Sequence, residues 1–231
     1  MRSTTRTNIQ LIANTNMGTT LSEYREALEE RMSQVEITEF YSDAMKDRWI
    51  NEAGRRVCNF HPWAWLNHAL RLESEANAEY YAYPSRFKKN SIYRVTEDEG
   101  EDEEEHLVVN FDLYKSHKEN ETEVKVASQL GDQWFIYPIP EAGTMLGIYG
   151  QLKWVELSGD SDEAIVPSSH DEAIIKMALA SALRKERRYN EANSEVAEVE
   201  GQSGILTRFI EGEKDQKPKG YMGRIRSSRW D

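Results

Sequence analysis

Few residue types in this sequence point to catalysis or metal binding. The single cysteine, Cys58, has no cysteine partner for a zinc site or an internal disulfide, and its place near an apolar helix face predicts a small core residue. His61 and His68 are seven residues apart and could share one helix face. Because no histidine falls at a metal-ligand spacing, we expect surface or packing roles and no metal site. The histidines are His61, His68, His106, His117 and His170.

Two acidic motifs could suggest chemistry, but each has a simpler structural interpretation. The His-Asp-Glu run at 170–172 stands at a predicted helix start, where the helix dipole favours carboxylates. The Asp-Ser-Asp-Glu run at 160–163 lacks the ligand spacing and the distal glutamate of an EF-hand calcium loop. It therefore predicts a solvated turn.

Sequence motifs of common enzyme classes are missing as well. The chain has no phosphate-binding or dinucleotide-binding glycine motif, no G-x-S-x-G and no H-E-x-x-H. Two carboxylates could still meet in space as in a glycoside hydrolase, but in a chain with 41 acids this carries almost no information. We predict no catalytic residue and no cofactor, and an acid–base hydrolase stays an alternative that a pocket of perturbed carboxylates would favour.

The most informative segment lies at the C-terminal end. Residues 214–231 carry six lysines and arginines against two aspartates, a net charge of +4, and their glycines and proline oppose a long helix. We interpret 212–231 as an extended segment that orders on an acidic protein or nucleic acid, with apolar anchors and charge-assisted hydrogen bonds. The alternative interpretation is that this C-terminal segment is disordered and has no functional role. The predicted contact residues are Lys217, Lys219, Tyr221, Met222, Arg224, Ile225, Arg226, Arg229 and Trp230.

The composition is that of a polar, acidic globular protein. The 231 residues include 29 lysines and arginines against 41 acids, a net charge of −12, which argues against general binding to DNA or anionic membranes. No apolar run approaches the ~20 residues that span a bilayer. Residues 1–16 lack an apolar core, so we expect a flexible arm rather than a secretory signal. A lone cysteine fits a reducing compartment.

Apolar residues recur with a helical period in two parts of the chain, before about residue 60 and after about residue 170. A capping box at 20–23 begins a predicted helix that runs to about 32, and a second helix is predicted over 43–59. Residues 62–75 are ambiguous between helix and strand. A helix from about 170 to 189 is predicted to continue to 200, followed by a short piece over 205–210. The predicted apolar faces are Leu21, Tyr24, Leu28 and Met32 in the first helix, and Ile174, Met177, Ala178, Ala182 and Leu183 in the helix that begins at 170.

Residues 79–157 have a different pattern. Short runs of aromatic and β-branched residues, one of them over 107–114, alternate with Gly, Pro, Asn and Asp, as expected for strands. Because no helical stretch separates the runs, we predict an antiparallel sheet or small barrel and no βαβ unit. Residues 97–105 hold eight acids in nine positions, which predicts an exposed hairpin loop.

Together these patterns predict an α+β, mainly α fold: an antiparallel helical bundle with an inserted antiparallel β-rich region and an extended C-terminal tail. The expected parts are an N-terminal arm with bundle helices over 1–65, the β-rich insertion with its acidic loop over 66–160, C-terminal helices over 161–211, and the basic tail over 212–231.

Three stretches share their order of elements and aromatic residues with one known family. The first is a short helix at 20–24 followed by W-I-N-E-A at 49–53 and tryptophans at 63 and 65. The second is F-I-Y-P-I-P-E at 135–141 followed by L-G-I-Y-G, and the third is I-V-P at 165–167 before an alanine-bearing helix. This pattern resembles the head–tail adaptor (connector) proteins of tailed bacteriophages. The resemblance covers about 20–65 and 134–200 and leaves 66–133 without a counterpart, as a possible insertion.

The resemblance implies a structural protein made in the host cytoplasm and located in the virion neck. Such adaptors form a twelvefold ring under the portal protein, extend the DNA channel and offer a docking face to the tail, tail-tube or nozzle proteins. The packaged DNA would pass without specific binding, no membrane is involved, and the C-terminal segment would reach the portal. An acidic body would suit such a channel, because negative walls repel phosphate.

Two alternatives stay open beside this interpretation. One is another neck or tail-completion protein of the virion. The other is a DNA-binding packaging or regulatory protein, with a helix-turn-helix within residues 20–60 and the basic tail as an arm. The net charge opposes the second alternative, as do the acids that outnumber Arg55 and Arg56 in their surroundings.

Overall fold

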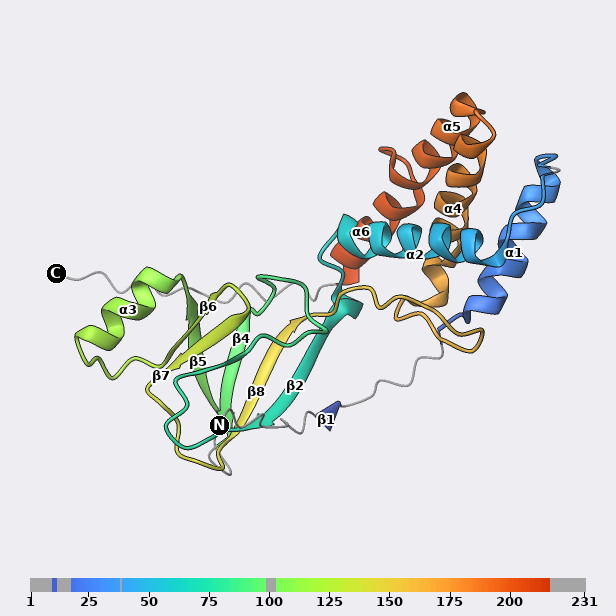
Figure 1. Ribbon diagram of the computed structural model, residues 1–231. Helices are drawn as coiled ribbons and strands as arrows, with labels where there is room; N and C mark the ends of the chain where they lie inside the picture. The colour runs from blue at the N-terminus through green and yellow to red at the C-terminus, as the bar shows by residue number, and fades with distance from the viewer. Residues whose placement is uncertain (1–9, 12–17, 38, 99–102, 217–231) are drawn as a thin grey trace. The chain divides into compact units, whose positions relative to one another are not determined.

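The computed structural model describes residues 10–11, 18–37, 39–98 and 103–216 (Figure 1). Their contacts form two compact units. The sheet unit contains the described residues up to 20 together with 65–167, and the helical unit contains 21–64 and the described residues from 168 onward. Among the described residues, no helix is long and apolar enough to cross a membrane.

The helical unit is built around α4 (Asp171–Lys185). This helix packs against α1 (Leu21–Gln34), α2 (Asp43–Phe60) and α5 (Tyr189–Glu200), and α5 in turn contacts α6 (Ile205–Gln216). Eight of the 15 residues of α4 are buried, so the helix is apolar around most of its circumference, as expected at the centre of a bundle. The predicted apolar face of α4 is confirmed, since all five of its residues are buried.

The first two helices lie close to their predicted positions. All four residues of the predicted α1 stripe are buried, because the spacing of 3 or 4 residues keeps them on the face toward α4 and α2. α2 begins after Ser42, whose extended backbone starts the helix without a side-chain cap. Cys58 on this helix is fully buried, which confirms its predicted core role.

The predicted continuation of one helix from 170 to 200 is wrong. Arg187 adopts a positive φ of 62°, and the backbone N–H of Arg188 donates to the carbonyl of Leu183 at 2.9 Å. This pattern ends a helix with one left-handed residue, so that α5 starts in a new direction. Such a position favours glycine, and the arginine here leaves no glycine signal in the sequence.

In the sheet unit, eight strands of the described residues form one sheet. Their order is β1-β2-β8-β4-β5-β6-β7-β3, and β5 and β6 are its only parallel neighbours among the described strands. A short 3₁₀ turn over Ala64–Leu66 precedes β2 in the chain. The strands are β1 (Gln10–Leu11), β2 (Asn67–Glu73), β3 (Tyr80–Ala82), β4 (Arg94–Asp98), β5 (Glu103–Val109), β6 (Val126–Leu130), β7 (Gln133–Tyr137) and β8 (Met145–Gln151).

The predicted fold class is wrong in its account of this region. The β-rich residues form a curled mixed sheet with its own core, not a small antiparallel insertion in a helical bundle. The predicted strand over 107–114 ends at Val109, and α3 (Phe111–Glu119) follows. α3 supplies the crossover that the parallel pair β5–β6 requires, so the region does contain a βαβ unit.

Local chemistry explains why α3 starts where it does. The side chain of Asn110 accepts a hydrogen bond from the backbone N–H of Leu113 at 2.8 Å and so caps the helix. Tyr114 is buried, and its ring lies 5.7 Å from that of Phe135 on β7. α3 therefore covers one face of the β6–β7 part of the sheet.

The core of the sheet unit lies on the opposite face. The register of β2 and β8 pairs Leu70 with Ile148 and Leu72 with Leu146, and all four side chains are buried. Alternate residues of the neighbouring strands complete this core, because side chains on a strand point to opposite faces in turn. They include Val95, Ala127, Trp134 and Ile136.

Candidate interaction surfaces

The predicted partner-binding residues of the C-terminal segment lie outside the described residues, as do positions 99–102 of the acidic block. These residues are Lys217, Lys219, Tyr221, Met222, Arg224, Ile225, Arg226, Arg229 and Trp230. The described residues offer other charged and apolar surfaces, which the sequence analysis did not identify.

The two histidines of the helical unit pack against aromatic rings. In the helical unit, His170 is buried at the start of α4, where its ring stacks on Phe209 at 4.2 Å between centroids and meets Trp63 edge-on at 5.1 Å. His61 also lies edge-on to Trp63, which confirms its predicted packing role. Among the described residues, no group of three ligand-type side chains could hold a metal ion.

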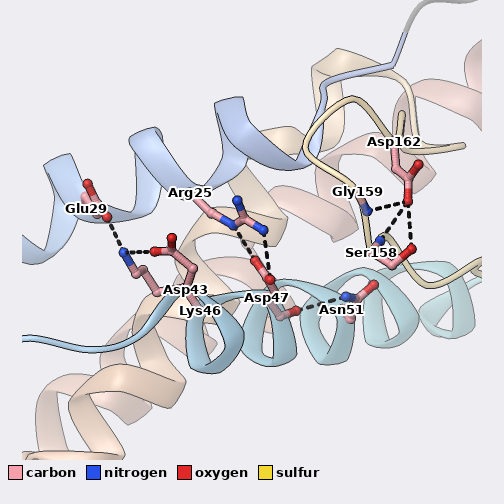
Figure 2. Close-up of polar contacts among 9 residues, drawn as sticks. All are labelled: Arg25, Glu29, Asp43, Lys46, Asp47, Asn51, Ser158, Gly159 and Asp162. Atoms are coloured by element: carbon pink, nitrogen blue, oxygen red, sulfur yellow. Dashed lines mark hydrogen bonds and ion pairs between the residues drawn. The ribbon is translucent and has the colours of Figure 1, made fainter.

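The acidic run at 160–163 forms a turn in the sheet unit, as predicted. The carboxylate of Asp162 accepts hydrogen bonds from the backbone N–H groups of Ser158 at 2.7 Å and Gly159 at 2.8 Å (Figure 2). Hydrogen bonds from these backbone groups and from the Ser158 hydroxyl hold the pKa of Asp162 below its usual value. Asp162 therefore acts as a turn-stabilising acceptor.

Two ionic contacts join α1 to α2 in the helical unit. The guanidinium of Arg25 binds both carboxylate oxygens of Asp47, with the Nη2–Oδ2 distance at 2.9 Å, and the Lys46 ammonium contacts Glu29 (Figure 2). Asn51 donates to the backbone carbonyl of Asp47 at 3.0 Å, one turn earlier in α2. A two-pronged arginine–carboxylate contact fixes orientation as well as distance, so this pair sets how the two helices lie.

Lys46 is buried yet charged. Only 4% of its side chain is exposed, and its ammonium lies 2.8 Å from Asp43 besides contacting Glu29. Burial alone would lower the pKa of Lys46, but the hydrogen bonds to Asp43 and Glu29 outweigh it, and the net shift is upward. The Lys46 ammonium is therefore already paired with Glu29 and Asp43 inside the helical unit. The acids around it leave this part of the surface of the helical unit negatively charged.

A groove lies where α1 ends and the chain turns into α2. We call it the α1–α2 groove; its volume is about 310 Å³. Phe40 at its edge is 92% exposed, an unusual state for a phenylalanine. The Tyr41 hydroxyl lies within hydrogen-bond distance of the carboxylates of Glu186 and Glu39, and burial together with these contacts raises its pKa. The groove is lined by Glu29, Met32, Ser33, Glu36, Ile37, Glu39, Phe40, Tyr41 and Lys46.

The lining of the α1–α2 groove suits a particular class of side chain. It holds three glutamates against one lysine, and that lysine is already paired. Phe40, Met32 and Ile37 add apolar surface. The groove can therefore accept a cationic side chain that has an apolar or aromatic neighbour. No sequence motif marks this groove, because its lining combines residues of α1, of the link that follows it and of the first turn of α2.

The sheet unit carries a local excess of positive charge, which we call the basic cluster: Arg86, Lys88, Lys89 and Lys153. Residues 80–96 contain four cations and no acid, although the whole chain is acidic. Backbone hydrogen bonds tie this segment to the end of β8, from Lys88 N to Gln151 O at 2.8 Å and from Lys153 N to Arg86 O at 2.9 Å. Lys153 thereby joins the three cations that lie more than sixty positions earlier.

A glycine on β8, Gly150, leaves room for the ring of Phe87, which lies between Arg86 and Lys88 of the basic cluster. Phe87 is buried and pairs with Leu152, and its ring packs on Gly150, where a Cβ would lie 2.6 Å from Cδ2 of Phe87. We expect Gly150→Ala to lower the free energy of unfolding by about 1–3 kcal/mol, because the ring or the strand must shift. Chemical denaturation measures this change.

A matched control is Gly212→Ala in α6, where no atom lies within 4 Å of the added Cβ. There we expect no loss, and a gain of up to about 1 kcal/mol, since alanine suits a helix better than glycine. Phe87→Leu should recover part of the stability in the Gly150→Ala background. Equal losses at both glycines would contradict the proposed packing.

Comparison with family models identifies a match that covers most of the chain. The model of a family described as SU10 adaptor protein matches residues 19–226, a range that includes the helices and the sheet, except β1. No curated protein matches the chain at a significant level.

Proposed function

Because this chain belongs to the SU10 adaptor protein family, a family of phage structural proteins, we propose that it forms a head–tail adaptor ring between the portal and the tail. The observation that carries the proposal is the match across 19–226, which takes in both compact units. In the proposed neck, the ring extends the DNA channel and offers a docking face to tail, tail-tube or nozzle proteins. The role is structural rather than enzymatic.

We propose a twelvefold ring that follows the symmetry of the portal. Neighbouring copies in a closed ring make heterologous contacts, in which one surface of a copy meets a different surface of the next. A net charge of −12 supports passage of packaged DNA without specific binding, since like charges repel.

Two segments are proposed to contact other virion proteins. The C-terminal residues from Lys217 to Trp230 combine cations with aromatic and apolar side chains and are proposed to order on the portal. The α1–α2 groove, with its acidic lining and exposed Phe40, is proposed to receive a cationic segment of a second virion protein.

The experiment is to mix the purified chain with the portal protein of the same genome, and to measure native mass and image the product. The expected product is a ring of the chain stacked on the portal. A variant that ends after Gln216 keeps all of α6 and is expected to lose at least tenfold in portal affinity while it unfolds at the same denaturant concentration. Portal and chain that stay separate at high concentration would overturn the proposal.

A further inference from the structure

We propose that the α1–α2 groove of one copy receives the basic cluster of a second copy of this chain. The inference rests on the proposed ring and deepens it, because it identifies the cationic segment that enters the groove and names a contact between neighbouring copies. The evidence is the opposite charge of the two surfaces, the exposed ring of Phe40 and the ordered backbone beneath the cluster.

The groove carries negative charge that its own side chains do not neutralise. Glu36 and Glu39 are exposed, and among the described residues neither carboxylate forms an ion pair. The lysine of the lining, Lys46, already contacts Glu29 and Asp43 (Figure 2). A cation brought by another surface therefore meets carboxylates that are still available.

A second cation beside the groove is engaged as well. The guanidinium of Arg188 donates to Glu191 at 2.7 Å and to the backbone carbonyl of Val35 at 2.6 Å. Hydrogen bonding to Glu191, together with the charges of Glu36 and Glu186, outweighs burial and raises the pKa of Arg188. The potential at this position is therefore negative, which favours an incoming cation.

Phe40 gives the groove an aromatic face for a guanidinium. The residue is 92% exposed, and its ring centroid lies 6.0 Å from the Lys46 ammonium, at the outer limit of a cation–π contact. Most of the ring surface is therefore open to solvent. Because a planar guanidinium can stack on an aromatic ring and bond a carboxylate, an arginine suits Phe40 and its neighbour Glu39.

The basic cluster presents an arginine and two lysines from an ordered backbone. Arg86, Lys89 and Lys153 are exposed. The carbonyl of Arg86 accepts a hydrogen bond from the N–H of Lys153 at 2.9 Å, and the carbonyl of Lys88 accepts one from the Tyr83 hydroxyl at 2.6 Å. A segment that is already held in this way loses little conformational freedom on binding, which favours association.

The charge of the cluster is available to a partner. Lys89 contacts Asp132, but the two side chains are 77% and 84% exposed. Such an exposed pair contributes little, so the lysine can exchange its partner. His68 on β2 is half-buried, and burial together with the nearby Arg86 guanidinium lowers its pKa. The local potential is therefore positive and attracts a carboxylate from outside.

A second copy of this chain is the partner that fits both surfaces. The groove belongs to the helical unit and the cluster to the sheet unit, so every copy carries one of each. A contact between two different surfaces is heterologous, continues from copy to copy and can close into a ring. Duplex DNA is the competing partner for the cluster, but a chain with a net charge of −12 repels it.

The test uses two full-length variants with reversed charge. The groove variant carries Glu36→Lys and Glu39→Lys, and the cluster variant carries Arg86→Glu and Lys153→Glu. Sedimentation at low salt, without the portal, measures self-association. We expect each variant alone to associate at least tenfold more weakly than the wild type, because its two surfaces then have like charge. The equimolar mixture, and a chain that carries all four changes, should recover wild-type association.

Further variants test the aromatic face and the place of the charges. Phe40→Ala should weaken self-association about threefold, since it removes the ring and leaves the carboxylates. Two controls reverse exposed charges outside both surfaces and should leave association unchanged: Glu119→Lys with Glu123→Lys in the sheet unit, and Arg208→Glu with Lys214→Glu in the helical unit. Wild-type association should weaken with salt, as expected for exposed charges.

Several results would overturn the proposal. One is a wild type that stays monomeric, and another is a folded mixture that does not recover association. A third is a cluster variant that binds duplex DNA more weakly and self-associates normally. A fourth is a pair of variants that associate like the wild type but unfold at lower denaturant concentration, since the two surfaces would then meet within one copy.

The proposed function and this contact can fail separately. Reversed variants that still form normal rings on the portal would remove the contact and leave the adaptor role. A wild type that ignores the portal, but whose variants recover association on mixing, would remove the adaptor role and leave the contact.

Discussion

Trp63→Ala is expected to lower the free energy of unfolding of the helical unit by about 3–5 kcal/mol. The Trp63 side chain is fully buried, and its indole N–H donates to the backbone carbonyl of Val57 at 2.8 Å. Its ring also meets His61 at 5.0 Å and His170 at 5.1 Å between centroids. Truncation removes the packing of a large aromatic and leaves a carbonyl without its donor, so the cavity and the lost hydrogen bond act in the same direction.

Denaturant titration followed by circular dichroism measures the loss. The matched control is Phe40→Ala, which removes an aromatic side chain that is 92% exposed and should change stability by less than about 0.5 kcal/mol. In contrast to Trp63→Ala, this control is expected to reduce binding of a partner at the α1–α2 groove. A loss of less than 1 kcal/mol for Trp63→Ala would show that the ring contributes little to the helical core.

The helices were predictable because their apolar residues follow a helical period. Leu21, Tyr24, Leu28 and Met32 fall on one stripe, and the fold buries that stripe. The break between α4 and α5 was not predictable, because the left-handed residue that makes it is Arg187. Local propensity gives no sign of a turn where a non-glycine residue adopts that conformation.

The sheet shows the limit of local pattern. Six of its strands fall on or overlap runs of aromatic and β-branched residues, but the order of the strands depends on pairing between distant segments. Residues 107–114 alternate partly like a strand, and only the Asn110 cap and the burial of Tyr114 identify the helix that starts within them. Without that helix, the parallel pairing of β5 and β6 could not be expected.

The family resemblance is confirmed, and it extends further than expected. The matched range of 19–226 includes the stretch from 66 to 133 that the resemblance left without a counterpart. This stretch contributes the five strands β2 to β6 of the described eight-stranded sheet and the crossover helix α3. It is therefore integral to the sheet unit, and its aromatic and acidic residues belong to the family-matched part of the chain.

The candidate surfaces were only partly predictable. The charge of the C-terminal segment and of the block at 97–105 is visible in the sequence, because in each case the charged residues lie close together along the chain. The basic cluster joins Lys153 to cations near position 88, and the α1–α2 groove joins the ends of two helices. A local signal for the cluster did exist, namely the acid-free run over 80–96 in an acidic chain.

Stability is expected to fall as the pH drops from about 6.5 to about 4, and His170 should account for a large part of this change. Burial lowers the pKa of His170 from 6.5 to about 4. Between these values the unfolded chain binds a proton that the folded chain does not, so acid favours unfolding. The shift corresponds to about 3 kcal/mol, which is fully present above pH 6.5 and is lost by about pH 4.

His170→Phe tests this account, since a phenylalanine can keep the stacking on Phe209 without a group that titrates. Urea titrations at pH 7, 6, 5 and 4.5 give the difference in unfolding free energy between variant and wild type. That difference should shift in favour of the variant by about 1–3 kcal/mol toward low pH. His117→Gln, at a half-buried position of α3, serves as the control and should not change the pH dependence of the helical unit. Parallel curves for wild type and His170→Phe would mean that the ring is protonated without cost in the folded protein, and that burial between Trp63 and Phe209 does not exclude its charge.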